Sequence, residues 1–179
     1  MPAPDSSAMP AGGSGDPAPG PLDLVQSFAS TLSADPDTDR LSTRDEAAAW
    51  LRAAALLPAG ASLTSSEHAA LLRLRDSLRD VLAAHTDGRQ DAAAAARLTR
   101  ALADGRLVLS VDPASTLQLA SAARASYPAA VAAIAIAIAE TAAAGTWLRL
   151  KSCPALRCGQ AFHDDSPSAA ARHCSRHIA

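Results

Sequence analysis

Residues 64–88 read TSSEHAALLRLRDSLRDVLAAHTDG, and this stretch carries the clearest helical pattern in the chain. Its apolar residues recur every three or four positions, which places them on one face of an α-helix. Thr64 and Glu67 fit a capping box, in which each side chain bonds a backbone N–H of the first turn. Glycine at position 88 is typical of a helix end. The sequence therefore predicts a long amphipathic helix, whose apolar face is made by Leu71, Leu74, Leu78, Val81 and Leu82.

Further helices are predicted on both sides of this one. Thr43 and Glu46 form a second capping box, and the helix that they open is expected to end at residues 58–60, which read Pro-Ala-Gly. A long alanine-rich stretch contains isoleucines that alternate as in a strand, but its length and a proline in its first turn favour a helix. The remaining helical windows are 22–32, 91–103 and 126–145.

The stretch at residues 106–119 departs from the helical pattern. Leu107, Leu109 and Val111 alternate with other residues, a turn sequence follows at 112–115, and a second short alternating run begins. This arrangement predicts a β-hairpin. We therefore expect a mainly α (α+β) fold, with a helical domain over 22–145 that includes one β-hairpin and a small zinc-ribbon-like module over 146–179. Residues 1–21 are rich in proline, glycine and serine and are predicted to form a disordered leader.

The three cysteines of the chain all lie in its last segment, together with three of the five histidines. Cys153 and Cys158 form one close pair, and Cys174 and His177 form another after a longer loop. Thiolate and imidazole are the ligands that tetrahedral Zn²⁺ prefers, and structural sites usually take four of them. The spacing therefore predicts a Cys₃His zinc site made by these four residues.

Two alternatives remain open for the tail. One is that His163 or His173 replaces His177 as the fourth ligand. The other is a degenerate finger, in which the cysteines are reduced and bind no metal. The adjacent carboxylates Asp164 and Asp165 lie in a polar loop, and we expect them to position the turn of the finger rather than to act in catalysis.

The charge of the chain is distributed unevenly. The formal net charge is −2, yet the tail is basic, and a basic tail on an acidic body is a reason to consider a polyanionic partner. The alternative is that these charges only surround a small metal module in solvent. The candidate contacts to nucleic-acid phosphates are Lys151, Arg157, Arg172 and Arg176.

Several classes of function are not supported by the sequence. There is no glycine-rich phosphate loop, nucleophile elbow or HExxH motif, so we expect no enzyme activity. The longest apolar stretch, residues 128–139, is shorter than the roughly 20 residues that span a bilayer, so no membrane association is expected. The odd number of clustered cysteines and the absence of a secretory signal indicate a cytoplasmic protein.

The tail resembles the start of a CGNR zinc finger. It has the cysteine pair, then the aromatic–Asp–x–Ser stretch of residues 162–166, and then the further cysteine, Cys174. The sequences Leu-Asp-Leu-Val at 22–25 and Ala-Trp-Leu at 49–51 are similar to the ABATE domain that accompanies this finger. The resemblance covers most of residues 22–175. The closing Cys-Gly-Asn-Arg signature of the finger is missing, and Ala179 stands where its cysteine would fall.

The resemblance implies a stress-induced transcription regulator. Its expected parts are a helical domain that senses a small-molecule ligand and a Zn²⁺ finger that contacts DNA. An alternative is a degenerate member of the family, whose helical domain binds a small molecule or a protein partner without any contact to DNA.

Overall fold

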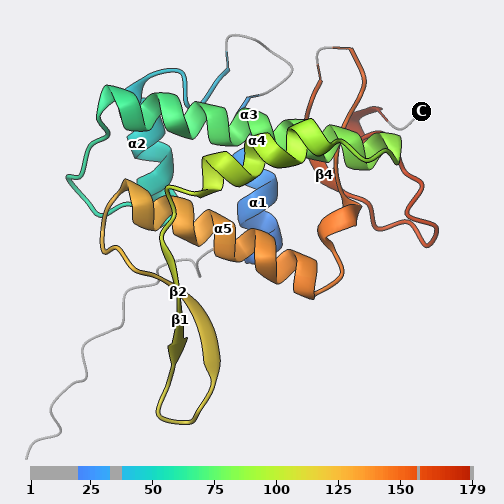
Figure 1. The fold of residues 1–179 in the computed structure, drawn as a ribbon. Coiled ribbons are helices and arrows are strands. Elements are labelled where there is room, and N and C mark those ends of the chain that lie inside the picture. The colour runs from blue at the N-terminus through green and yellow to red at the C-terminus, as the bar shows by residue number, and fades with distance from the viewer. Residues whose placement is uncertain (1–19, 33–37, 157, 178–179) are drawn as a thin grey trace, which may run out of the picture.

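The computed structural model describes residues 20–32, 38–156 and 158–177 (Figure 1). Nearly all of the predicted leader therefore lies outside the described residues. Within the described residues, five helices form the body: α1 (Pro21–Ala29), α2 (Arg44–Ala53), α3 (Ser65–Asp87), α4 (Ala92–Leu102) and α5 (Tyr127–Ala143). Two hairpins accompany them, β1 (Leu107–Val111) with β2 (Leu117–Ser121) and β3 (Leu150–Ser152) with β4 (Ala161–His163). Short 3₁₀ turns lie at Trp147–Arg149 and Ser175–His177.

The predicted helix α3 begins and ends where its sequence signals lie. The hydroxyl of Thr64 accepts from the N–H of Glu67, and the Glu67 carboxylate accepts from the N–H of Thr64, so the capping box is complete. Gly88 follows the helix in the left-handed conformation, with φ 63°. The mainly helical fold with one early hairpin is thus confirmed, and the structure adds the small hairpin β3–β4.

Helix α2 is shorter than the sequence indicated. Its capping box at Thr43 is present, but the helix ends at Ala53 rather than near residue 58. The chain turns at Ala55, which takes φ 58°, and the N–H of Leu56 donates to the carbonyl of Leu51. This closure is a Schellman-type turn, which usually uses glycine and therefore leaves no clear signal when alanine occupies the position.

The hydrophobic core surrounds α3 and is built mainly from leucines. Phe28 of α1 and Trp50 of α2 supply its aromatic contact, with ring centroids 5.5 Å apart. Together with Tyr127 they are buried in the core. Aliphatic side chains with less than 2% exposure include Leu41, Leu51, Leu71, Leu74, Leu78, Leu82, Val131 and Ile134.

The two hairpins lie in different environments. Figure 1 shows β1 and β2 projecting away from the helices. The second hairpin lies against them, with β3 packed on α3 and β4 on α1. Leu150 of β3 and Ala161 of β4 belong to the same core as the helices. Within the described part of the chain, no helix combines the length and the apolar character needed to cross a bilayer.

Candidate metal centre

The first cysteine pair lies in the loop that joins β3 to β4. Cys153 directly follows β3, and its N–H donates to the carbonyl of Gln160 over 2.9 Å. Gly159 takes φ 57°, and its N–H donates a hydrogen bond to the carbonyl of Cys153 over 3.2 Å. This tight loop turns the thiols of Cys153 and Cys158 to the same side of the hairpin, where both are buried.

The second pair lies on the 3₁₀ turn near the end of the described chain. Cys174 precedes this turn, and its carbonyl accepts from the N–H of His177 over 2.8 Å. The turn places both side chains on one side, so the Cys174 thiol is buried while His177 covers the cluster from the solvent side. Three thiols and one imidazole therefore meet, and their ligand atoms all lie within 4.8 Å of one another.

Three of the six separations within this cluster are close to the edges of a tetrahedron around one ion. The Sγ atoms of Cys158 and Cys174 are 3.7 Å apart, and Nδ1 of His177 lies 3.4 Å from Sγ of Cys174 and 3.7 Å from Sγ of Cys153. A tetrahedral ion with Zn–S of about 2.3 Å and Zn–N of about 2.0 Å requires S···S of about 3.8 Å and S···N of about 3.5 Å. The residues present thus fit a tetrahedral S₃N site.

The thiols differ in how readily they ionise. Burial and the neighbouring thiols of Cys174 and Cys153 raise the pKa of Cys158 to about 11. Burial also opposes ionisation of Cys153, but backbone hydrogen bonds from Cys174 and Ala155 outweigh it and lower the pKa of that thiol. Since a metal binds the thiolates, its binding must release protons and must weaken as the pH falls.

The two alternative histidines are not part of this cluster. Nδ1 of His163 lies 2.6 Å from the carboxylate of Asp165. His173 is exposed and is absent from the group of ligand atoms. The structure therefore brings together Cys153, Cys158, Cys174 and His177, the same set that the spacing predicted.

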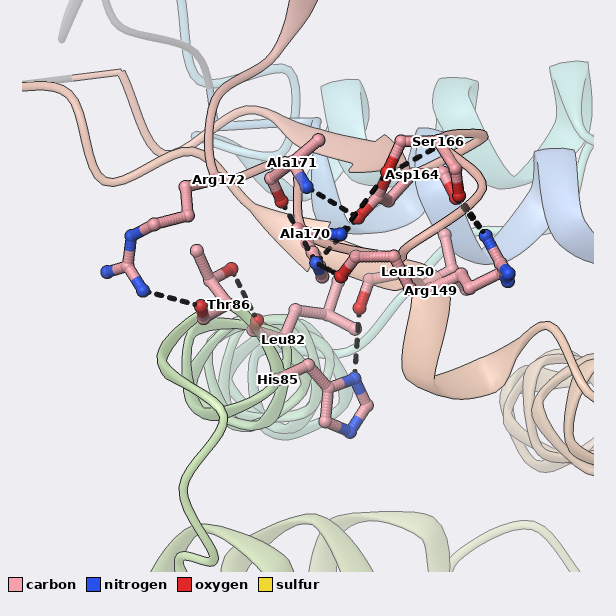
Figure 2. Close-up of polar contacts among 12 residues, drawn as sticks. Leu82, His85, Thr86, Arg149, Leu150, Asp164, Ser166, Ala170, Ala171 and Arg172 are labelled. Atoms are coloured by element: carbon pink, nitrogen blue, oxygen red, sulfur yellow. Dashed lines mark hydrogen bonds and ion pairs between the residues drawn. The ribbon is translucent and has the colours of Figure 1, made fainter.

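A buried ion pair supports the loop that carries the second pair. The ammonium of Lys151 lies 2.6 Å from the carboxylate of Asp164, and both side chains are almost fully buried. Asp164 also accepts from the N–H groups of Ser166 and Ala171, at 3.0 and 2.9 Å. Burial alone would raise the pKa of Asp164, but the hydrogen bonds from Lys151 and Ser166 outweigh it and hold that pKa well below its usual range. Figure 2 shows Asp164 with Ser166 and Ala171, in the loop that leads to Cys174.

One comparison with known proteins bears on the helical part of the chain. The family model ABATE, described as "Putative stress-induced transcription regulator", matches residues 21–145. The chain belongs to the ABATE family. Among curated proteins, none matches this chain. The matched span includes α1 to α5 and the hairpin β1–β2, so it ends just before the segment that leads into the metal centre.

The metal module is packed directly on the ABATE domain at the C-terminal end of α3. The hydroxyl of Thr86 accepts from the N–H of Ser152 over 3.0 Å and lies 2.8 Å from the carbonyl of that residue. One residue earlier, Nδ1 of His85 lies 2.9 Å from the carbonyl of Leu150. A carbonyl only accepts, so this nitrogen carries the proton. Figure 2 shows both side chains reaching from α3 to β3.

Further contacts hold the module from both of its sides. Arg172 donates from one nitrogen to the carbonyl of Thr86 and from another to the carboxylate of Asp87, each over 2.9 Å. On the other side, the N–H of Ala161 donates over 3.2 Å to the hydroxyl of Ser30, which directly follows α1. These contacts were not predicted, because nothing in the local pattern indicates which residues meet over such sequence distances.

The basic residues that were predicted to contact phosphates differ in their exposure and in their hydrogen-bond partners. Lys151 is 5% exposed, and its ammonium bonds Asp164 and the carbonyls of Ala169 and Ala171. All three N–H donors of the ammonium are therefore used within the protein, which leaves none for a phosphate. Arg172 is half-exposed and bound to α3, and Arg176 is exposed. Arg157 lies outside the described residues.

Proposed function

We propose that the tail of this ABATE protein binds one Zn²⁺ through Cys153, Cys158, Cys174 and His177. The observation that carries this proposal is the agreement between three ligand–ligand separations in the structure and a tetrahedral S₃N site. Three sulfur ligands favour a thiophilic ion, and zinc is the usual choice for a closed tetrahedral site of this composition. Bound there, the ion would act as a structural cross-link, because the four ligands leave no open position for catalysis.

We further propose that the protein is a cytoplasmic transcription regulator and not an enzyme. Family membership supports regulation, and the exposed guanidinium groups of Arg176 and Arg172 beside the cluster offer contacts to nucleic-acid phosphates. The ABATE domain would then carry the ligand-sensing role. Since the module is held by α3, a change at that helix would reach the finger directly.

A second candidate function is supported by a specific observation. Hydrogen bonds within the protein use N–H donors of Arg149, Lys151 and Arg172. Less positive charge is therefore free to contact phosphates than the sequence suggested. The tail would then be a structural support for the ABATE domain, which would bind a small molecule or a protein partner without DNA.

Metal content tests the first proposal. We expect about one zinc per chain in protein purified without added metal, and loss of that zinc in Cys174→Ser. His163→Asn is the matched control, since it removes an imidazole of the same module that lies outside the ligand group. X-ray absorption should report three sulfur neighbours and one nitrogen neighbour. Purified protein without stoichiometric metal, or zinc that survives Cys174→Ser, would contradict the proposal.

Binding to double-stranded DNA over a series of salt concentrations separates the two functions. If Arg176 contacts a phosphate, Arg176→Gln should weaken binding and reduce the slope of log K against log salt by about 0.9. Arg100→Gln, an exposed position on α4, is the control. No binding of the zinc-loaded chain at low salt would exclude the DNA-binding function and favour the second candidate.

A further inference from the structure

The hairpin β1–β2 carries an apolar surface that the fold does not cover. The register pairs Leu109 with Leu119 and Val111 with Leu117. Because side chains alternate across a strand, these residues and Leu107 lie on one face of the hairpin. Their exposed fractions run from 40% to 65%. We call the surface made by Leu107, Leu109, Val111, Leu117 and Leu119 the hairpin face.

The concentration of apolar surface at this place is unusual for the described chain. Of the eight large apolar side chains that are exposed among the described residues, six lie on the hairpin. The hairpin projects from the helices, and none of the other elements that the structure describes packs on its outer part (Figure 1). A two-stranded hairpin is marginally stable in water by itself, and contiguous exposed apolar surface usually marks an interaction site. A partner on this face would both cover the leucines and stabilise the strands.

The chemistry of the hairpin face restricts what can cover it. Neither β1 nor β2 contains a charged residue, and the face itself is wholly aliphatic. Its partner must therefore present aliphatic surface of similar extent. The other large apolar side chains exposed in the described chain, Leu148 and Leu156, lie isolated near the metal module. The one matching surface that the described residues offer is the hairpin face of a second copy.

The geometry and the area permit this pairing. Five-residue strands are about 17 Å long, so two hairpins stacked in opposite directions overlap fully while the two helical bodies lie at opposite ends. A biological interface buries about 1,000 Å² in total, or roughly 500 Å² from each copy. Five aliphatic side chains at this exposure, with the strands that carry them, supply an area of that order. An interface of this area indicates a reversible dimer of moderate affinity.

We propose that the chain forms a symmetric dimer in which the hairpin faces of two copies stack on each other. The contact is isologous, since the same five residues are buried on both sides of a two-fold axis. The dimer carries one metal module at each end. This inference rests on the hairpin alone and does not depend on the proposed zinc or nucleic-acid binding.

Sedimentation velocity of the metal-loaded full chain tests the proposal. Over roughly two decades of micromolar concentration, the mass should rise from that of the 18.2 kDa chain toward twice that value. The double variant L109T/L119T keeps residues that favour strands but removes the central leucine pair, and it should weaken the dimer at least tenfold. Val108→Thr, on the opposite face of the same strand, is the matched control and should leave the dimer unchanged.

Hydrogen exchange of the hairpin amides provides a second measurement that does not depend on mass. Protection of residues 107–121 should increase with protein concentration in the parent chain and in Val108→Thr, but not in L109T/L119T. A parent chain that stays monomeric throughout would overturn the proposal. So would a dimer that L109T/L119T leaves intact, which would place the interface elsewhere, or a monomer whose hairpin binds phosphatidylcholine vesicles, which would assign the face to a lipid surface.

Discussion

Lys151 and Asp164 show how single residues organise the metal module. Removing a charge from water is costly, and a buried ion pair is favourable only when its other hydrogen bonds are also satisfied. Here the ammonium bonds three oxygens, and the carboxylate accepts from Ser166 and Ala171 as well as from Lys151. The pair therefore specifies the path of the loop that leads to Cys174. The position of Lys151 in a basic tail made it a reasonable candidate for phosphate binding. In the folded chain, its ammonium instead bonds Asp164 and two backbone carbonyls.

Thr86 is the residue on which the docking of β3 depends. Thr86→Val keeps the shape of the side chain but removes the hydroxyl, and it leaves the N–H of Ser152 without a partner in a buried position. We expect the free energy of unfolding to fall by about 1–3 kcal/mol, measured by urea denaturation of the metal-loaded chain. Thr99→Val is the control, because the Thr99 hydroxyl bonds only a carbonyl of its own helix. Equal effects of the two substitutions would contradict a docking role for Thr86.

His85 gives the stability of the chain a dependence on pH. Burial lowers its pKa from the usual value near 6.5, with the charge of Lys151 acting in the same direction, and the hydrogen bond to the carbonyl of Leu150 opposes them only in part. The unfolded chain therefore binds this proton more readily than the folded chain. The contribution of His85 to the free energy of unfolding is full above pH 6.5. It is lost as the pH falls through the lowered pKa of His85 in the folded chain.

A comparison with His85→Asn isolates this contribution, because an asparagine amide can keep the donor to Leu150 but does not titrate. We expect the stability of the parent chain to fall more steeply than that of the variant between pH 7.5 and about 5.5. Thermal unfolding of both proteins across this range provides the measurement. All other residues are the same in the two chains, so their contributions cancel in the difference. Parallel pH profiles would contradict the assignment.

Among the elements, α3 is specified most completely by its own sequence. Its capping box, its apolar stripe and its terminal glycine are local signals that agree with one another, so its predicted ends were confirmed. Helix α5 is different, because its N-cap Ser126 makes no capping hydrogen bond through its side chain. Its position depends on packing, with Ala130, Val131 and Ile134 fully buried.

This difference between the helices can be measured at their caps. Thr64→Ala removes one of the two reciprocal bonds of the capping box and should lower the free energy of unfolding by about 1 kcal/mol. Ser126→Ala, at the corresponding position of α5, should change it by much less. Chemical denaturation of the two variants under identical conditions is the measurement. A larger loss for Ser126→Ala would mean that the cap of α3 contributes less than its geometry indicates.

On the scale of the whole molecule, the metal module and the ABATE domain share one core. Leu150 and Ala161 pack with the helices, while the three cysteines and Phe162 form a small second cluster. Ligand binding to the folded state stabilises it by mass action. Because β3 is bonded to α3, that stabilisation should reach the helical domain and should not stay within the tail.

Removal of the metal tests this coupling. A chelator should lower the unfolding temperature of the full chain and increase amide exchange in the last turns of α3, which contact β3, more than in its first turns. Cys174→Ser should reproduce the effect without chelator. A chelated chain in which only residues 150–177 exchange faster would show that the ABATE domain is stable independently of the module.

Most helices, the early hairpin and the clustering of metal-ligand residues follow from the sequence alone, because periodicity, caps and residue chemistry are local properties. Cys153, Cys158, Cys174 and His177 could be proposed together from spacing alone. Only the tertiary structure decided that Lys151 is buried, that His85 and Thr86 hold the module on α3, and that the hairpin face is uncovered. The physical reason is that burial and hydrogen bonding at these positions depend on partners distant in sequence, such as Arg172 for Asp87 or Ser152 for Thr86. No pattern within one segment encodes those pairings.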